Sequence, residues 1–212
     1  MQTIQNGDFI ELEYTGWLTD EKQVIDTTSA EVAKANKVFD EHAAYKPSVI
    51  CLAEGHIPKG LDLQLVGVDV GKQYKFELEP EDAFGKKSAK LIQLIPTTNF
   101  FNDKINPVPG LRVNVDGLIG VVRTVTGGRT LVDFNHPFAG KRITYDAKVL
   151  RIIADDLEKV NALAGIMGLE LKAELKDSGL VIRGLDNPEA RERLGQDIPR
   201  LISSIKTVSF ES

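Results

Sequence analysis

Cysteine is nearly absent from the sequence: Cys51 is the one cysteine among 212 residues. A single cysteine excludes an intrachain disulfide framework. It stands in the apolar run 48–52, so we expect a small buried core residue there rather than a reactive thiol. No apolar run approaches the roughly 18 residues that a membrane-spanning helix needs. Together with a polar N-terminus that lacks a signal-peptide pattern, this predicts a soluble, cytoplasmic protein with no membrane partner.

Clusters of metal-binding or phosphate-binding residues are missing as well. The three histidines, His42, His56 and His136, are far apart, and no His- or Cys-rich tail is present, so we expect no metal and no other cofactor. The pair Gly127-Gly128 lacks the Lys-Ser/Thr that follows the glycines of a phosphate-binding loop. A formal net charge of -5 argues against nucleic acid as a main partner.

What the sequence does contain is an ordinary globular balance, with 42% hydrophobic and 27% charged residues. Apolar and polar residues alternate over several short segments, which is typical of half-buried strands. Leu61 and Leu65 lie one helical turn apart, and Gly67 follows as a natural helix end. The first part of the chain is therefore expected to contain strands at 8–15, 24–26, 48–52, 72–79 and 142–152, and short helices near 30–35 and 61–66.

The later segments predict two further structural units. Residues 86–136 combine an apolar cluster with two hairpin signals, at Asp116-Gly117 and Gly127-Gly128, which favour a small β unit. Residues 154–212 predict a small α/β domain. Its expected elements are a helix at 155–166, strands at 168–175 and 179–184, a helix at 188–206 that breaks near Pro199, and a last strand at 207–210.

A set of short motifs, in this order and spacing, resembles the FKBP-type peptidyl-prolyl cis/trans isomerases. The motifs are Tyr14-Thr15-Gly16, the segments 24–28, 55–62 and 70–72, Glu81-Asp82-Ala83-Phe84-Gly85, and the stretch 133–141 with Asn135-His136 and Ala139-Gly140. The last motif is similar to the one that marks SlyD-type members, which carry a domain inserted in the flap. The insertion at 29–46 and the additional C-terminal region make the chain most similar to long archaeal members.

The resemblance implies an α+β fold in which a curved antiparallel sheet wraps around one short helix. Three domains would follow: an isomerase domain at 1–85 and 137–153, an insert-in-flap chaperone domain at 86–136, and a C-terminal domain at 154–212. The implied activity is X-Pro bond rotation in unfolded or proline-containing polypeptides, combined with holding unfolded chains.

Catalysis of this rotation needs no nucleophile, because it requires only a site that binds the twisted amide better than the planar forms. By resemblance, Tyr14, Asp26 and Tyr145 are the catalytic residues, with Asp26 acting electrostatically on the twisted carbonyl. The residues implied to bind the proline-containing substrate are Ile25, Ile50, Ile57, Leu61, Phe84 and Phe138. Without the resemblance, most of these residues would be predicted to form an ordinary β-domain core.

Two departures from the family pattern keep an alternative open. Pro58 stands where the family usually offers a backbone N–H, which proline lacks, and Phe84 lacks the hydroxyl that many members carry. A holdase chaperone with a weak or inactive isomerase site is therefore the second interpretation. A nucleic-acid-binding β module is a third, and the acidic balance counts against it.

Two hypotheses concern the added domains. The insert carries many apolar residues for its size, which form either its own small core or an exposed surface that holds unfolded chains. The residues predicted for this surface are Leu91, Ile92, Leu94, Ile95, Phe100 and Phe101. For the C-terminal domain the hypothesis is homodimer formation through an open strand edge.

Overall fold

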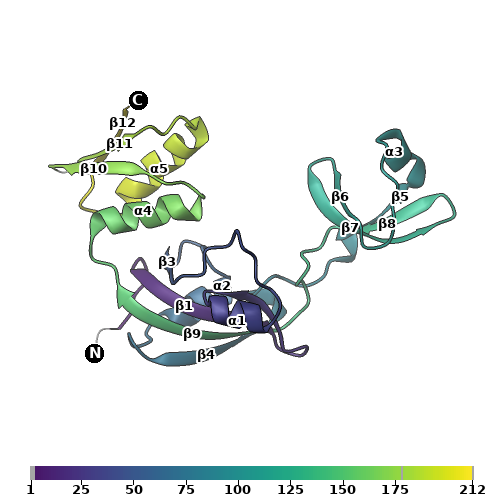
Figure 1. The fold of residues 1–212 in the computed structure, drawn as a ribbon, viewed down its shortest axis with the longest axis horizontal. Helices are drawn as coiled ribbons and strands as arrows, with labels where there is room; N and C mark the ends of the chain where they lie inside the picture. Colours follow the sequence, from purple (N-terminus) through teal and green to yellow (C-terminus); the bar gives the residue numbers. More distant parts are fainter. Residues whose placement is uncertain (1–2, 178, 212) are drawn as a thin grey trace. The chain divides into compact units, whose positions relative to one another are not determined.

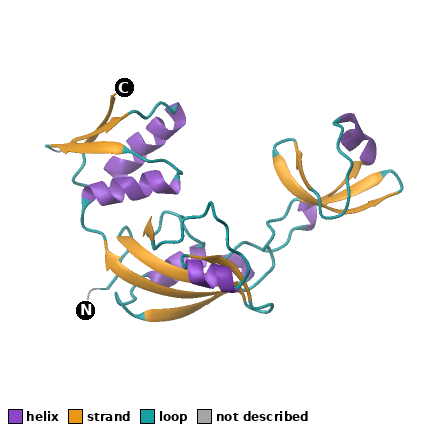
Figure 2. Cartoon of the chain, in the orientation of Figure 1, coloured by secondary structure: helices purple, strands orange, loops and turns teal. Residues whose placement is uncertain are grey.

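The computed structural model describes residues 3–177 and 179–211. The chain divides into two compact units, Met1–Leu78 with Ile143–Ser212, and Glu79–Arg142. Figure 1 shows that the chain leaves the first unit after β4, forms the second unit and returns as β9. The mixed composition of helices and antiparallel strands in Figure 2 confirms the α+β class.

The first unit contains a five-stranded antiparallel sheet, which we call the body sheet. Its strands are β1 (Phe9–Leu18), β2 (Gln23–Thr27), β3 (Ser48–Cys51), β4 (Gln73–Leu78) and β9 (Ile143–Ile152). The order is β2-β1-β9-β4, and β3 also pairs with β1. Strand β1 pairs with β3 along its first half and with β2 along its second half, so its one long edge supports two short strands. All five predicted strands of this part are present.

The alternation of residues along these strands builds the core beneath the sheet. Ile10 and Leu12 of β1 and Phe76 and Leu78 of β4 are buried, whereas Glu11 between the first two is partly exposed and Glu77 between the last two is exposed. Helix α2 (Lys59–Leu65) contributes Leu61 and Leu65 from one face, as their spacing predicts. The short helix α1 (Ala30–Ala35) begins at Ser29, whose side chain accepts a hydrogen bond from the Val32 N–H.

The second unit is built around a four-stranded sheet with the order β5-β8-β7-β6. Its elements are the 3-10 turns η1 (Pro80–Asp82) and η2 (Ala89–Leu91), the strands β5 (Ile92–Pro96), β6 (Arg112–Val115), β7 (Leu118–Thr126) and β8 (Arg129–Asp133), and helix α3 (Thr97–Asn102). Asp116-Gly117 and Gly127-Gly128 form the two predicted hairpin turns. Helix α3 was not expected from the sequence, because Thr97-Thr98-Asn99 is a poor helix-forming start.

The C-terminal domain belongs to the first unit. It comprises α4 (Asp156–Ile166), β10 (Lys172–Lys176), β11 (Gly179–Arg183), α5 (Pro188–Leu201) and β12 (Thr207–Glu211). The sheet order is β10-β11-β12, with β12 parallel to β11. The prediction of a helix to residue 206 was wrong at its end: α5 stops at Leu201, two residues after Pro199, whose ring nitrogen cannot donate to the preceding turn.

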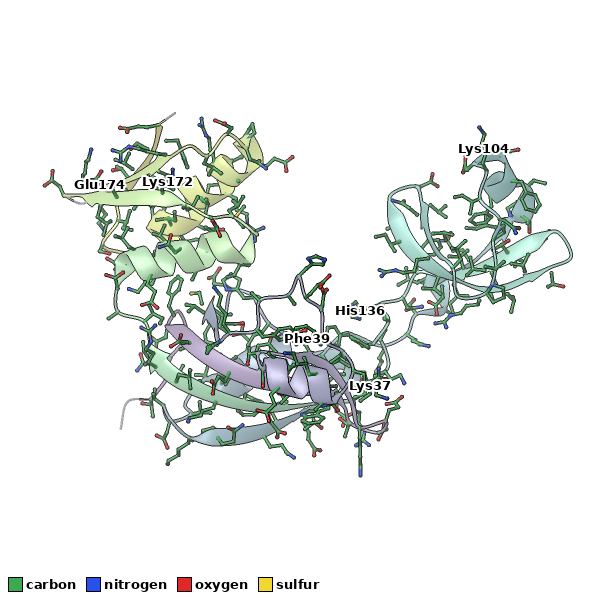
Figure 3. All side chains as sticks on the ribbon, viewed as in Figure 1. Lys37, Phe39, Lys104, His136, Lys172 and Glu174 are labelled. Atoms are coloured by element: carbon green, nitrogen blue, oxygen red, sulfur yellow. The ribbon has the colours of Figure 1, made fainter. Side chains whose placement is uncertain are left out.

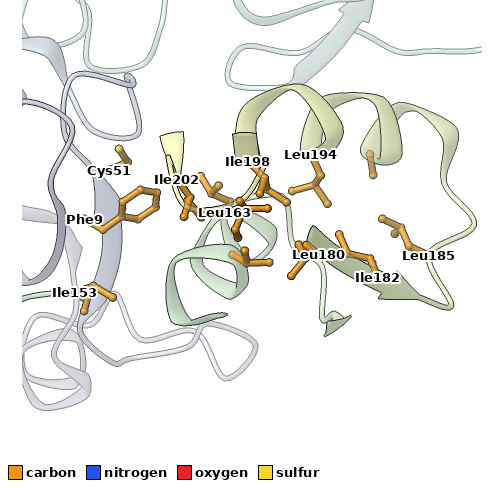
Figure 4. Packing of buried hydrophobic residues seen from close by; sticks show 13 residues of the cluster. Phe9, Cys51, Ile153, Leu163, Leu180, Ile182, Leu185, Leu194, Ile198 and Ile202 are labelled. Carbon is orange, nitrogen blue, oxygen red and sulfur yellow. The ribbon is translucent and has the colours of Figure 1, made fainter. Parts of the chain in front are cut away.

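One hydrophobic cluster joins the C-terminal domain to the body sheet (Figure 4). Phe9 of β1, Cys51 of β3 and Ile153 after β9 pack in the same cluster as Ile198 and Ile202 of α5 and its end. Cys51 is 1% exposed, which confirms the predicted core position. The C-terminal domain and the body sheet therefore share a core. Within the described residues, no helix is long and apolar enough to cross a bilayer.

Candidate functional site

The structure brings the three predicted catalytic side chains together on neighbouring strands. Gly16 of β1 lies opposite Asp26 of β2 on one side and opposite Tyr145 of β9 on the other. The Tyr14 hydroxyl donates to Asp26 Oδ2 at 2.7 Å. The rings of Tyr14 and Tyr145 meet edge to face, with centroids 6.0 Å apart. The site is therefore a carboxylate held by Tyr14, whose ring in turn packs against Tyr145.

Gly16 makes the close approach of Tyr145 possible. A Cβ atom at residue 16 would lie 2.7 Å from Tyr145 Cε1, closer than carbon atoms pack. The Tyr145 ring can therefore lie over β1 only because residue 16 has no side chain. Sequence analysis noted the Tyr14-Thr15-Gly16 motif but did not assign Gly16 this role.

The electrostatics of the site keep both phenols protonated. Burial is the main cause of the raised pKa of Tyr14, and the charge of Asp26 and the hydrogen bond to it add to the effect. Burial, followed by the Asp26 charge, also raises the pKa of Tyr145. Tyr14 is therefore a permanent hydrogen-bond donor to Asp26 and fixes the orientation of its carboxylate.

A pocket of about 260 Å³ opens beside this carboxylate. Tyr14, Ile25 and Asp26 line one part of it, so three of the predicted site residues share one cavity. The remainder of the lining is contributed mainly by the segment between α1 and β3. The lining residues from this segment are Val38, Asp40, Ala43, Ala44, Tyr45 and Lys46.

This segment belongs to the insertion at 29–46, and its position beside the pocket was not expected from the sequence. Phe39 and Tyr45 stack with ring centroids 5.1 Å apart, and the Lys34 ammonium lies 4.8 Å from the Phe39 centroid. The Tyr45 hydroxyl accepts a hydrogen bond from the Asp40 N–H at 2.9 Å. Phe39, labelled in Figure 3, is exposed. The available signal was two aromatic residues, six positions apart, in an otherwise polar stretch.

Other predicted substrate-binding residues of the first unit lie outside the lining of this pocket. Ile50 and Leu61 are buried in the core, while Ile57 is half-buried in the loop before α2. Within the described residues, no group accepts a hydrogen bond from the Ile57 N–H. The Ile57 N–H is therefore an available backbone donor directly before Pro58, which has no N–H of its own.

Phe84 and Phe138 lie in the second unit, where they form an aromatic cluster with His136. The rings of Phe84 and His136 are stacked with centroids 4.5 Å apart, and the Phe138 ring meets both edge to face. His136 was named in the sequence as one of three separate histidines and as part of a motif, and its contact with the two phenylalanines was not expected. The participation of Phe84 and Phe138 in substrate binding stays a prediction.

The apolar residues predicted for the insert surface differ in exposure. Phe101 is 57% exposed, and Leu91, Ile92 and Leu94 are also exposed. Ile95 is half-buried against the core of the insert. The prediction that Phe100 belongs to this exposed surface is wrong. Its side chain is 3% exposed, because α3 turns the ring into the cluster with Val113, Val122 and Val132.

Four exposed apolar residues of the insert were not expected from the sequence: Val108, Leu118, Ile119 and Val125, the last of which lies on β7 before the Gly127-Gly128 turn. Leu118 and Ile119 stand at the start of β7, directly after the Asp116-Gly117 turn, and Val108 lies in the loop before β6. Their apolar side chains next to turn residues were the available signal, since a hairpin end offers little cover.

Two family models match adjoining parts of the chain. Residues 1–100 match the model described as FKBP-type peptidyl-prolyl cis-trans isomerase. Residues 93–138 match the model described as FKBP26, IF domain. The first match includes Tyr14 and Asp26, and the second includes most of the sheet of the second unit.

Comparison with individual proteins gives the same assignment. The short-type peptidyl-prolyl cis-trans isomerase of Methanocaldococcus jannaschii is 31% identical over 146 residues, which cover 69% of this chain and 92% of that protein. The FKBP-type 16 kDa peptidyl-prolyl cis-trans isomerase of Escherichia coli is 36% identical over 132 residues, or 60% and 83%. The FKBP-type isomerase SlyD of Haemophilus influenzae is 27% identical over 146 residues, or 66% and 76%.

Proposed function

The chain belongs to the FKBP-type peptidyl-prolyl cis-trans isomerase family, and from that premise we propose that it rotates X-Pro bonds at the Tyr14–Asp26 pocket and holds unfolded clients with its insert. Enzymes of this family act on proline-containing polypeptides. The observation that supports the proposed site is the hydrogen bond from Tyr14 to Asp26 beside a pocket of about 260 Å³.

The chemistry requires a site that is selective for the twisted amide. Rotation about the peptide C–N bond faces a barrier of about 18–20 kcal/mol, because planarity is stabilised by resonance. Resonance places negative charge on the carbonyl oxygen of the planar amide, and twisting removes it. A fixed negative charge near that oxygen destabilises the planar forms more than the twisted one, which lowers the barrier.

The residues of the site fit these requirements. Asp26 supplies the negative charge, and the Tyr14 hydroxyl fixes its carboxylate in one orientation. Tyr145 is 3% exposed and packs edge to face against Tyr14, so it supports the Tyr14 ring, and burial raises its pKa so that its hydroxyl stays protonated. The half-buried Ile25 adds apolar surface for the proline ring. No proton transfer and no covalent step is needed.

The proposed chaperone role rests on the exposed apolar residues of the insert. An exposed apolar surface binds unfolded chains because burying it on a client removes it from water. Of the residues predicted from sequence, Leu91, Ile92, Leu94 and Phe101 are available for this role, and we add Leu118 and Ile119. Ile119 is 61% exposed.

The test combines two assays on one set of variants. Refolding of a protein limited by one X-Pro bond reports the isomerase, and suppression of aggregation of an unfolded protein reports the holdase. Leu118→Ser with Ile119→Ser is expected to weaken aggregation suppression severalfold and to reduce the acceleration of refolding. Leu63→Ser is the matched control, because Leu63 on α2 is also 61% exposed but lies in the other unit. Equal losses in both variants would refute the assignment.

A holdase with an inactive isomerase site is the alternative, motivated by Pro58 and Phe84. The same assays separate the two functions. A pure holdase suppresses aggregation and leaves the slow refolding phase unchanged, whereas an isomerase accelerates that phase at catalytic amounts. The Ile57 N–H without an intramolecular acceptor favours the isomerase, because it can replace the donor that Pro58 lacks.

We also propose that the C-terminal domain forms a homodimer. Strand β10 pairs with β11 alone, so its other edge can accept a strand from a second copy. Leu175 on β10 and Ile166 at the end of α4 are exposed apolar residues of the same domain. Light scattering of the full chain should give the mass of two copies, and Leu175→Arg should give the mass of one. A monomeric wild-type protein would contradict this proposal.

A further inference from the structure

The loop between β3 and α2, residues 53–58, is held by the C-terminal domain; we call it the Glu54 loop. It continues from β3, whose first residue, Ser48, lines the pocket, and it leads into α2. It carries Ile57, with its available N–H, and Pro58. The position of this loop therefore determines where the N–H and the side chain of Ile57 are presented to a peptide.

Contacts within the body fix the two ends of this loop but not its centre. The Ala53 backbone has φ of 66°, in the left-handed region that disfavours a residue with a Cβ atom. Its N–H is held by both carboxylate oxygens of Asp62, each at 3.0 Å. At the other end, His56 Nδ1 accepts a hydrogen bond from the Cys51 N–H at 3.1 Å. The side chain of Glu54, near the centre of the loop, forms its ion pair with the C-terminal domain.

That ion pair is formed with Arg200 in the last turn of α5. Arg200 Nη1 donates to Glu54 Oε1 at 2.8 Å, and Nη2 donates to Oε2 at 2.7 Å. Nη2 also donates to Asp197 Oδ1 at 2.7 Å, which fixes the guanidinium on its own helix. A bidentate pair fixes the orientation of both groups, which a single ionic contact does not.

The helix that carries Arg200 is itself anchored to the body. Ile198 and Ile202, which flank Arg200 by two residues on each side, are buried in the cluster that contains Phe9 and Cys51. The backbone at Arg200 is therefore held by packing, and its guanidinium reaches Glu54 from a fixed helix.

We propose that Arg200 is a positioning residue for the isomerase: it fixes the Glu54 loop, and through it the Ile57 N–H, so that the C-terminal domain tunes the affinity for proline-containing peptides. The proposal rests on the proposed isomerase function. Without the pair, the loop samples several conformations, and a peptide that binds must select one of them. The expected consequence is weaker peptide binding with an unchanged chemical step.

The experiment uses the full chain with Arg200→Ala, Arg200→Lys, Glu54→Ala and the double variant Arg200→Ala with Glu54→Ala. Arg183→Ala is the matched control, because Arg183 also joins two carboxylates, Glu174 and Glu211, but on the sheet of the same domain. Three quantities are measured for each: kcat/KM for a short Xaa-Pro peptide, the Kd of a proline-containing peptide by NMR titration, and amide hydrogen exchange at residues 53–57.

Arg200→Ala and Glu54→Ala should each raise the Kd about threefold, the size expected for a partly exposed bidentate pair. The double variant should be no worse than either single one, since both remove the same contact. Arg200→Lys should lie between, and exchange at 53–57 should accelerate in step with the Kd. Arg183→Ala should change none of the three quantities.

Unchanged Kd and unchanged exchange in Arg200→Ala would overturn the proposal, as would an equal effect of Arg183→Ala. An inactive wild-type chain would refute the proposed isomerase function instead. Peptide affinity and loop exchange would still decide the role of Arg200 in that case, because neither measurement needs turnover.

Discussion

The two units of the chain bury their apolar residues to very different extents. The largest fully buried side chains of the described residues, among them Ile10, Leu61, Ile143 and Leu194, all lie in the first unit. The core of the insert consists mainly of Phe100 and three valines. A thin sheet with one short helix cannot cover its own apolar residues, whereas the body sheet is covered by α2 and by the C-terminal domain.

This difference corresponds to the two proposed activities. A site that distinguishes a twisted from a planar amide needs a fixed carboxylate, and the packed body provides one that is held by Tyr14, whose ring packs against Tyr145. Holding diverse unfolded chains needs apolar surface without a fixed shape, and the insert exposes Leu94, Phe101 and Ile119. The low burial of apolar residues in the insert is therefore consistent with its proposed role of holding unfolded chains.

The strongest test of the difference between the two units is to unfold the insert alone. A Cβ atom at Gly120 would lie 2.6 Å from Val132 Cγ1 and 2.7 Å from Phe134 Cδ1. In so small a core, Gly120→Ala should cost about 1–3 kcal/mol and unfold most of the insert. Circular dichroism and NMR should show loss of the insert signals with the body signals kept. Cooperative loss of both units at the same denaturant concentration would contradict their independence.

The next largest effect concerns the fixed charge of the body. Asp26→Asn keeps an acceptor for the Tyr14 hydroxyl but removes the charge, so kcat for a short Xaa-Pro peptide should fall about tenfold, or about 1.4 kcal/mol. Glu13→Gln is the control, because it removes an exposed charge from the opposite face of β1. Equal rates for Asp26→Asn and wild type would mean that the charge does not contribute to catalysis.

The pH dependence of the free energy of unfolding tests the packing of His56 in the Glu54 loop, and a smaller effect is expected. Burial is the main cause of the lowered pKa of His56, whose ordinary value is 6.5. The unfolded chain therefore takes up this proton at a higher pH than the folded one. The stabilising contribution is complete above about pH 6.5 and falls as the pH drops toward the folded pKa.

Denaturant unfolding at about pH 7.5 and about pH 5.5 measures this contribution. His56→Gln should lose less of its free energy of unfolding between the two values than wild type does, because glutamine does not titrate. An acid loss as large in His56→Gln as in wild type would assign the effect to the carboxylates.

The last prediction concerns the reactivity of the Cys51 thiol, where the smallest effect on stability or activity is expected. Burial, with help from the Glu54 charge, raises the pKa of Cys51 to about 12. Near neutral pH the native protein should therefore react with a thiol reagent far more slowly than the unfolded chain does. Labelling of native protein at the unfolded rate would show that the shared core opens readily. The variant Cys51→Ser has no thiol and gives the background signal of the labelling assay.

Much of this architecture was predictable because it depends on local patterns. Alternation located the strands of the body, and Asp116-Gly117 and Gly127-Gly128 located the hairpins of the insert. Motifs shared with the family predicted that Tyr14, Asp26 and Tyr145 would lie together. Each of these signals involves neighbouring residues or a strand period, which physical chemistry relates directly to conformation.

Local patterns in the sequence thus predicted the strands of the body sheet, the hairpin turns and the buried position of Cys51, and the motifs predicted the grouping of Tyr14, Asp26 and Tyr145. Only the tertiary structure decided that the segment 38–46 lines the pocket, that Phe100 is buried while Phe101 is exposed, and that Arg200 reaches Glu54. These outcomes depend on contacts between residues that are distant in the chain. Which side chains meet there follows from the packing of whole elements, and no local pattern encodes it.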